Sequence, residues 1–436
     1  MSHNEKLPDP TEPVALKDRR SPLLNYFATL RRFSRNAKLF LIYALLSGLG
    51  TGVWNVMFNI YLLRLGYATT FVGLFWMVDM LFHGLFAFPA GLIGDKIGRR
   101  KTFILATTFN IFARGALLFT RDPAMLLILA ALGGMGEGFH AVAGAPFMME
   151  NSEPKERPHL FSLNASLMMF SFFVGSLSGG FLPLFWAGIL AVPAVDPSAA
   201  RWALVIALPL TFIALLPLAV IREKPVDLVE SFSDLFTLQN VIHYGVIFKL
   251  TLCNLLVGIG FGMTTRFFNL FFNMAHDASD DQVGFFLAIG ALGAAVTVLL
   301  SPNITRRWGM SMGITLSSIA SIPFLLFMAA FSNLPLVVFF FVIRGAIYTI
   351  TMPLRNQLSM MFVVSRERST TAGITHMAFD LGGGAGAFLA GTMIVGGEFL
   401  GAFSVASVLI AVPALLYYFF FAKMEDAHRA TASVQL

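Results

Sequence analysis

Charged residues are scarce in this sequence. Asp, Glu, Lys and Arg make up 12% of its 436 residues, whereas about 25% is usual in soluble globular proteins. Hydrophobic residues make up 57%, and the mean hydropathy is +0.75. So few charges cannot cover a water-exposed surface of ordinary composition, and this places the chain among membrane proteins.

Cysteine is nearly absent, since Cys253 is the only one. A single thiol excludes an intrachain disulfide and a multi-cysteine metal site, so the redox compartment cannot be inferred. A signal-peptide core is also missing, because residues 1–37 are polar. The N-terminus is therefore expected to stay in the cytoplasm.

Nucleotide-binding motifs are lacking as well. Glycine runs such as "GLGTG" (48–52) and "GGGAGAFLAG" (382–391) lie inside apolar segments and are not followed by Gly-Lys-Ser/Thr. They are better explained by close helix packing. The net charge of +6 arises from short loops and an N-terminal tail, so we expect lipid rather than nucleic acid as the partner. No cofactor and no metal site are predicted.

Long apolar runs are what the sequence does contain. A membrane-spanning helix needs about 20 mostly apolar residues, and twelve segments qualify. They are 39–63, 70–94, 102–120, 124–148, 159–190, 200–221, 245–273, 282–302, 310–331, 334–357, 369–395 and 398–422. The runs are continuous, which argues against a β-barrel. The predicted class is an all-α membrane protein.

Lys and Arg are distributed unequally between the loops. With both termini inside, the cytoplasmic tails and loops hold most of them, and the opposite loops hold only Arg64, Arg121 and Arg201. The longest interior break divides six spans from six. The expected organisation is listed as a tail (1–38), a first half (39–221), a cytoplasmic loop (222–243), a second half (244–422) and a tail (423–436).

The two halves resemble each other in sequence. "GLGTGVWNVMFNIYL" (48–62) aligns with "GIGFGMTTRFFNLFF" (258–272), which pairs Asn59 with Asn269. "EGFHAVAGAP" (137–146) aligns with "RGAIYTITMP" (344–353). Such repeats are typical of transporters whose binding site lies between two pseudo-symmetric halves.

The segment "GLIGDKIGRRK" (91–101) lies between the second and third spans. It resembles the signature of the major facilitator superfamily, Gly-x-x-x-Asp-(Arg/Lys)-x-Gly-Arg-(Arg/Lys). Twelve spans and a six-plus-six repeat agree with this family, so the resemblance covers nearly the whole chain. It implies alternating access in two pseudo-symmetric six-helix halves, the major facilitator fold. The signature gives almost no information about which substrate is transported.

The resemblance also implies roles within a cytoplasmic gate motif. Gly91 and Gly98 would allow close packing and a tight turn, and Asp95 would face the start of the eleventh helix. Arg99, followed by Arg100, would bind acidic or carbonyl groups. The second-half copy, "NITRRWGMSMG", has Arg306 in place of the aspartate, which implies a one-sided gate. The fifth span lacks the Gly-Pro pair of the antiporter signature, which weakens a drug–proton antiport assignment.

Two charges occupy equivalent positions of the repeat. Glu137 and Arg344 each stand nine residues before a proline, and both fall near mid-membrane. Because a charge there costs about 2.5 to over 10 kcal/mol unless it is paired or hydrated, we expect them to pair with each other. Two roles for these residues remain open: they could bind the substrate or couple transport to protons, or they could form a static salt bridge between the halves.

Other candidate residues are listed as Asp79, His83, Asp380, Arg266, Trp54 and Asn55. Asp79 and His83 share a helix face and could form a hydrogen-bonded pair, a proton site, or a metal or catalytic pair. Asp380, with His376 one turn before it, could be a proton site or structural. Arg266 could attract an anion or only reach the interface, and Arg114 could be structural or take part in coupling.

The sequence thus predicts a secondary transporter and not an enzyme, since no convergent nucleophile–base set is present. We expect proton-coupled movement of a small organic or amphipathic solute, with export as the first direction considered. The alternatives are uptake of an organic anion steered by Arg266 and Arg344, or a non-transporting receptor of the same fold. The expected partners are a small solute, protons and the cell-membrane bilayer, and the chain is expected to be a monomer.

Overall fold

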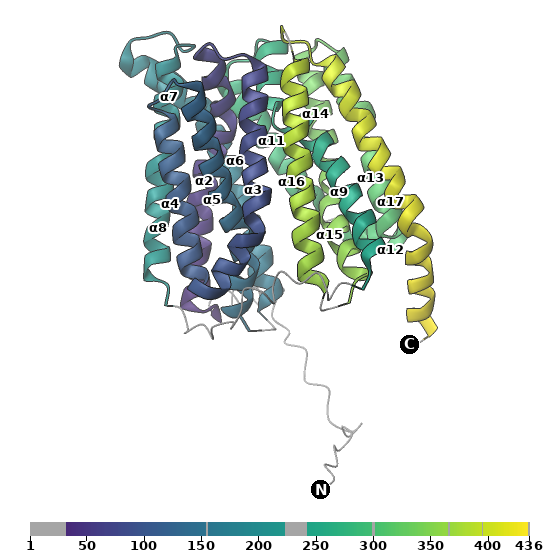
Figure 1. Ribbon diagram of the computed structural model, residues 1–436. Coiled ribbons are helices and arrows are strands. Elements are labelled where there is room, and N and C mark those ends of the chain that lie inside the picture. Colours follow the sequence, from purple (N-terminus) through teal and green to yellow (C-terminus); the bar gives the residue numbers. More distant parts are fainter. Residues whose placement is uncertain are drawn as a thin grey trace, which may run out of the picture.

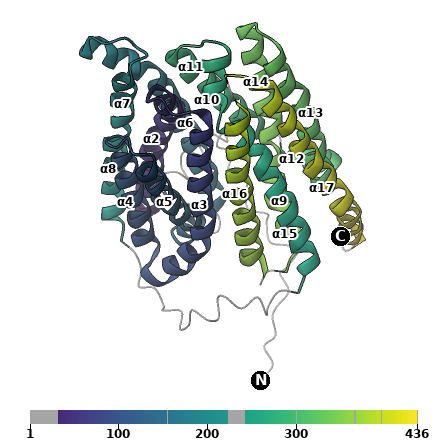
Figure 2. The same cartoon turned by 45° about the horizontal axis from the view of Figure 1, so that its top comes forward.

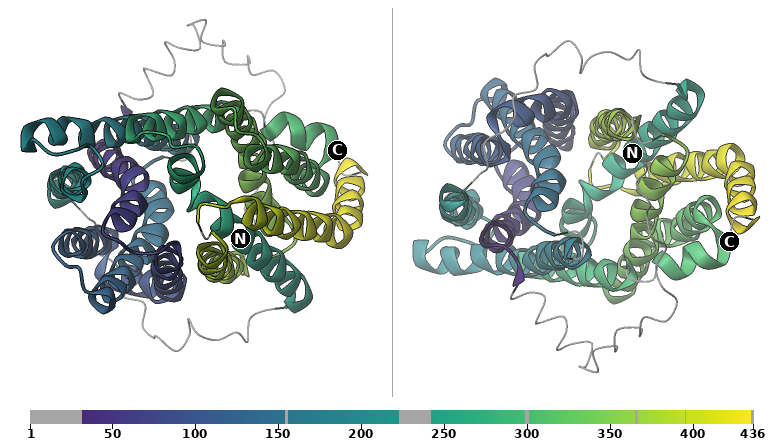
Figure 3. Two further views of the ribbon diagram at one scale, coloured as in Figure 1. Left: turned by 90° about the horizontal axis from the view of Figure 1, so that it is seen from above. Right: turned by 90° about the horizontal axis from the view of Figure 1, so that it is seen from below.

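The computed structural model describes residues 32–153, 156–222, 242–298, 301–364, 367–394 and 396–434. These residues form two helical bundles that stand side by side (Figures 1 and 2), with the first half coloured purple to teal and the second green to yellow. Views along the helices show the same division (Figure 3). Most of the predicted tail 1–38 and of the loop 222–243 lies outside the described residues.

Each half contains several long helices. The helices of the first half are listed as α2 (Arg35–Arg64), α3 (Thr69–Ile97), α4 (Arg99–Leu117), α5 (Pro123–Glu150), α6 (Arg157–Leu190), α7 (Pro197–Val205) and α8 (Ala207–Val220). Those of the second half are listed as α9 (Tyr244–Thr265), α10 (Phe268–Leu270), a π-helical turn (Phe271–Ala275), α11 (Asp280–Val298), α12 (Ser301–Trp308), α13 (Met310–Ala330), α14 (Leu334–Thr349), α15 (Thr351–Met361), α16 (Arg368–Met393) and α17 (Leu400–Val434). We call the end where α2 begins and α17 ends the lower end (Figure 1).

Ten segments of the described residues are long and apolar enough to cross a membrane. The predicted spans 102–120 and 369–395 correspond to α4 and α16, which are not among the ten. Charged residues at the start of α4, and polar and glycine residues along α16, lower their hydropathy. Both helices nevertheless lie within the bundles beside the others (Figure 1).

Local sequence signals explain where several helices begin. The Asp122 carboxylate accepts the backbone N–H of Met125 at 2.7 Å, and Pro123 follows as the first residue of α5. Asn333 caps α14 in the same way. Such caps satisfy a backbone donor that has no partner inside the helix, and proline lacks the donor altogether.

The predicted span 245–273 is not one continuous helix. The α-helix α9 ends at Thr265, and a short helix and a π-helical turn follow. The side chain of Asn269 accepts the backbone N–H of Leu270 at 2.9 Å, and the carbonyl of Arg266 accepts a hydrogen bond from Asn59 in the other half. These side-chain hydrogen bonds replace part of the regular backbone hydrogen bonding of an α-helix. The spacing of apolar residues alone does not predict such a break.

The Asn59–Asn269 pair joins the two halves. Asn59 donates to the side-chain oxygen of Asn269 at 3.0 Å and to the Arg266 carbonyl at 2.6 Å. Asn269 donates to the Val56 carbonyl at 2.9 Å. The two residues aligned by the sequence repeat therefore bind each other, and each binds the backbone of the opposite half.

Further contacts close the upper end between the halves. Arg64 at the end of α2 forms a 2.7 Å ion pair with Asp280 at the start of α11. The Thr69 hydroxyl of α3 donates to the carbonyl of Gly391 in α16 and to that of Ile394, which caps α16. The structure thus has the two halves joined at the upper end of the bundle.

Glycines allow α9 and α16 to pack backbone against backbone. A side-chain carbon added to Gly386 would overlap the carbonyl of Ile259, and one added to Gly382 would overlap that of Leu255. The glycine run 382–391 therefore serves close helix packing and does not form a phosphate-binding loop, as expected.

We therefore expect Gly386→Ala to destabilise the protein by about 1–3 kcal/mol, the usual cost of overpacking. Gly188→Ala is the matched control, because nothing lies within 4 Å of an added carbon there. The melting temperature of the purified protein should fall for Gly386→Ala and stay level or rise for Gly188→Ala. Equal melting temperatures for both variants would contradict the packing argument.

Glu367, the residue before α16 at the lower end, binds the segment that precedes α9. Its carboxylate accepts the backbone N–H groups of Ile242 and His243 and lies 2.7 Å from Nδ1 of His243. The hydrogen bond from the Ile242 backbone, followed by those from His243, lowers the pKa of Glu367 to about 2 from its ordinary 4.5. A carboxyl group with a lowered pKa stabilises the fold above its unfolded pKa, and this stability is lost as the pH falls through the folded pKa.

Glu367→Gln is consequently expected to lower the melting temperature at neutral pH. The difference from wild type should shrink as the pH falls from about 4.5 to about 2, because the wild-type carboxylate is protonated over that range. Melting curves of both proteins across this pH range measure the effect. A difference that does not change with pH would show that the carboxylate charge is not what stabilises this junction.

Candidate functional site

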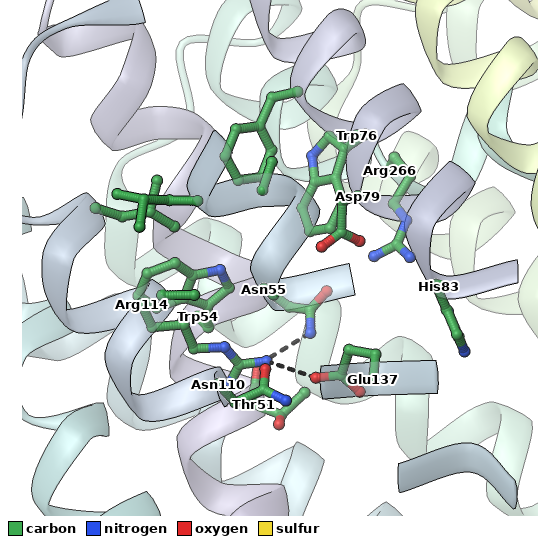
Figure 4. Close-up of a pocket in the computed structure, with 16 residues that line it drawn as sticks. Thr51, Trp54, Asn55, Trp76, Asp79, His83, Asn110, Arg114, Glu137 and Arg266 are labelled. Carbon is green, nitrogen blue, oxygen red and sulfur yellow. Dashed lines mark hydrogen bonds and ion pairs between the residues drawn. The ribbon is translucent and has the colours of Figure 1, made fainter. Parts of the chain in front are cut away.

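A cavity lies between the two halves. On the first-half side a space of about 150 Å³ is lined by α2, α3, α4 and α5, with Arg266 reaching in from the second half (Figure 4). On the second-half side a space of about 230 Å³ is lined mainly by α9, α11 and α14. Both spaces are lined by Asn55, Trp76 and Arg266, so we treat them together as the central cavity.

A further space, here called the lower cavity, continues from the central one. It has a volume of about 460 Å³ and is lined by α9, α14, α15 and α16. Phe261, Tyr348 and Thr349 line both this space and the second-half side of the central cavity. A solute that enters from the lower end could therefore reach the central cavity along the second half.

Glu137 pairs with Arg114 and not with Arg344 as expected. Nη2 of Arg114 lies 3.1 Å from Oε1 of Glu137, and both residues belong to the first half (Figure 4). The Arg114 guanidinium also stands over the Trp54 ring at 5.3 Å. The expected Glu137–Arg344 pair is wrong for this structure because Arg344 faces the second-half side of the cavity. Helix rotation, which the repeat does not specify, decides this.

Asp79 stands in the same cavity without a hydrogen bond or ion pair among the described residues. Figure 4 shows its carboxylate beside the guanidinium of Arg266, and the two charges interact. No described hydrogen bond joins Asp79 and His83, so of the alternatives left open for these two residues the structure does not support the hydrogen-bonded pair. His83 instead turns toward Asp380 of the other half, with 3.9 Å between Nδ1 and a carboxylate oxygen.

Arg266 connects the halves at the centre of the cavity. It is the C-cap of α9, and its guanidinium lies 4.1 Å from the centroid of the Trp76 ring of α3. Its Nε is buried without a hydrogen-bond partner in the described structure. Asn55 also faces both sides of the cavity and donates to the Thr51 carbonyl at 3.0 Å.

Arg344 is 3% exposed and lines the second-half side of the cavity. Its one described hydrogen bond is to the Thr264 hydroxyl at 3.3 Å, and its Nε has no partner among the described residues. The guanidinium lies between the rings of Phe268 at 4.9 Å and Tyr348 at 5.1 Å. The residues that line this side include two arginines and no acid.

His376 and Asp380 form a close pair on α16. Nδ1 of His376 is 2.9 Å from Oδ2 of Asp380, four residues later in the same helix. Asp380 is 2% exposed, and His376 lines the lower cavity. His83 of α3 completes a group that the sequence did not connect, because its members come from different halves.

Trp76 and Tyr348 are cavity residues that sequence reasoning missed. Trp76 Nε1 donates to the Asn59 side chain at 2.8 Å, and its ring lies against Arg266. Tyr348 lies four residues after Arg344, and this spacing placed it on the same helix face. That spacing was the available signal for Tyr348, while none distinguished Trp76 from the other aromatic residues.

The gate motif lies at the lower end. Gly98 has φ of 92° and separates α3 from α4, and Gly309 at the equivalent turn of the second half has φ of 89°. Arg99 Nε lies 3.3 Å from Glu150 Oε1, and Arg100 donates to the carbonyls of Leu218 and Ala219.

One expectation for this motif is not met, and another is not tested. An added side-chain carbon on Gly91 would meet no described atom within 4 Å, so the expected close packing there is wrong. The side chain of Asp95 lies outside the described part, and its expected contact with the start of α16 stays a prediction. The described contacts of Arg99 and Arg100 fasten helices of one half to each other.

A family model described as Major Facilitator Superfamily matches residues 39–387 and 250–435. A curated relative, "Uncharacterized MFS-type transporter YcaD" of Salmonella arizonae, is 30% identical over 146 residues, which are 33% of this chain and 36% of the relative. The chain thus spans about a third of the length of that relative.

Several solved structures are similar to this one. A mutant form of the nucleoside transporter NupG has a TM-score of 0.74 at 13% identity, covering 88% of this chain and 100% of that one. The D-xylose-proton symporter has a TM-score of 0.70 at 13% identity, covering 91% and 98%. A bacterial homologue of the human lysosomal transporter Spinster, inward-facing and occupied, has a TM-score of 0.67 at 15% identity, covering 92% and 97%. At these identities the likeness establishes the fold alone.

Proposed function

The chain belongs to the Major Facilitator Superfamily, and we propose that it is a secondary active transporter of a small amphipathic organic anion, driven by a proton gradient through alternating access. The family and the multi-pass fold point to transport rather than catalysis. The anion is the organic-anion alternative that the sequence left open. One observation carries it, namely the buried Arg344 in a cavity side without an acid.

A buried guanidinium without a countercharge is expensive in a membrane protein, at about 2.5 to over 10 kcal/mol. A solute carboxylate or phosphate would supply the missing countercharge, because a guanidinium binds such groups in a bidentate manner. Apolar residues such as Phe172, Phe341 and Leu287 also line this side, together with uncharged amide and hydroxyl side chains. These residues fit a solute with one anionic end and an apolar or aromatic body.

Arg266 could couple solute binding to protonation. In this structure its charge faces Asp79, and it also lines the second-half side of the central cavity, where Arg344 would bind the anion. Protonation of Asp79 would weaken its hold on Arg266, and Arg266 would then be able to bind the solute anion. Proton and anion would thereby favour each other's binding, which is the requirement for symport.

The test begins with a thermal-shift screen of amphipathic carboxylates and phosphates on the purified protein, followed by flux of the tightest binder in liposomes. Symport predicts accumulation inside when the outside is more acidic. Accumulation only when the inside is more acidic would indicate the export-type exchange also considered from the sequence. Binding without any flux would identify a receptor of the same fold.

We propose that the lower end faces the cytoplasm, because most Lys and Arg of the loops and tails gather on that side in the sequence. Reporter fusions after Asp122, which begins α5 at the upper end, and after Thr237 in the central loop should report opposite sides of the membrane. Fusions reporting the same side would contradict this orientation.

A further inference from the structure

His83 of α3 meets His376 and Asp380 of α16 at the contact between the halves. One ligand atom from each of the three lies within 4.8 Å of the others. His376 Nδ1 is 2.9 Å and His83 Nδ1 is 3.9 Å from the two oxygens of Asp380, and the two imidazole rings are 5.7 Å apart. His83 Nε2 is buried without a hydrogen-bond partner among the described residues.

The donor set selects a class of metal ion. Two imidazoles and one carboxylate suit zinc, nickel, copper or ferrous iron, whereas magnesium and calcium prefer oxygen ligands. Ligand atoms of a tetrahedral zinc site lie roughly 3.4 Å apart, given zinc–ligand bonds of about 2.0–2.1 Å. His376 Nδ1 is 2.9 Å from Oδ2 of Asp380, His83 Nδ1 is 3.9 Å from Oδ1, and one ligand atom from each residue lies within 4.8 Å of the others. Side-chain rotations that bring these atoms to about 3.4 Å from one another would complete the three-ligand geometry.

The surroundings hold the ligands in place and leave a route to them. An added side-chain carbon on Gly84 would lie 3.1 Å from Cβ of Asp380, which shows how closely α3 and α16 approach here. The His376 side chain is 52% exposed and lines the lower cavity. An ion could therefore arrive from the lower cavity, and three protein ligands leave a fourth position for water.

We propose that His83, His376 and Asp380 form a transition-metal site of the zinc class that bridges the two halves of the protein. The sequence offered Asp79 beside His83 as its only metal candidate, and the structure provides different partners for His83. The site does not depend on the identity of the transported solute. Because its ligands come from both halves, a bound ion would stabilise the arrangement of the halves seen here.

The experiment adds ZnCl₂, and separately CoCl₂, to the purified full-length chain in detergent. Zinc at 100-fold above its Kd is expected to raise the melting temperature by about 3 °C, and cobalt should give visible d–d absorption. His83→Ala and His376→Ala should each abolish both signals, which tests the contribution of each half. His276→Ala, which removes a histidine between the π-helical turn and α11, should retain them.

Full signals in His83→Ala or in His376→Ala would overturn the bridging site, and so would a folded wild type that gives no shift and no cobalt band. If an alanine variant melts lower without metal, His83→Asn and His376→Asn replace it, and retention of the cobalt band in either one would refute the proposal. Metal binding without any solute transport would leave this inference standing and count against the proposed function alone.

Discussion

Arg344→Met is expected to abolish binding of the solute anion while leaving the melting temperature unchanged or higher. Methionine keeps much of the volume and removes a buried charge that has no acidic partner among the described residues. Replacing a buried charge by an apolar residue of similar volume is often neutral or stabilising. Loss of a buried charge-assisted contact to the ligand costs about 2–5 kcal/mol, so the affinity should fall at least about 30-fold.

Loss of affinity without a loss of melting temperature distinguishes a binding role of Arg344 from a structural one. A structural arginine would lower both the melting temperature and the affinity when replaced. Arg344→Lys should retain part of the affinity, because lysine keeps the charge and loses the planar fork. Arg201→Ala is the control, since Arg201 stands over Phe119 near the upper end, outside the central cavity, and it should bind like wild type.

Asp79→Asn is expected to eliminate proton-driven accumulation of the solute and to preserve its exchange across the membrane. Asparagine resembles the protonated carboxyl group, so Arg266 would no longer be held by a negative charge on α3. Binding of the anion should then become independent of pH, whereas the wild type should bind more tightly as the pH falls. Liposome uptake with and without a pH gradient, together with solute exchange at equal pH, measures both effects.

Glu137→Gln distinguishes the two carboxylates of the cavity. Glu137 already has Arg114 at 3.1 Å in its own half, so its replacement should mainly lower stability by leaving that arginine without its partner. Asp122→Asn, at the helix cap of α5, serves as the control, because asparagine also caps helices. Proton-driven accumulation that survives in Asp79→Asn and disappears in Glu137→Gln would assign the coupling to Glu137 instead.

The sequence by itself determined the features that depend on short segments. Crossing a membrane requires only about 20 apolar residues in a row, and ten of the predicted spans meet this requirement in the described structure. The turn at Gly98 and the caps at Asp122 and Asn333 also follow from a few neighbouring residues. The internal repeat went further, because it aligned Asn59 with Asn269, which bind each other across the halves.

Only the tertiary structure decided which charged groups meet. Successive side chains of a helix are about 100° apart around its axis, so a partner depends on how each helix is rotated and where it crosses its neighbours. Glu137 and Arg344 occupy equivalent depths, yet Glu137 faces Arg114 while Arg344 faces Thr264. His83 meets Asp380, nearly 300 residues away in the chain, because the glycine-lined faces of α3 and α16 let the two halves approach at that level.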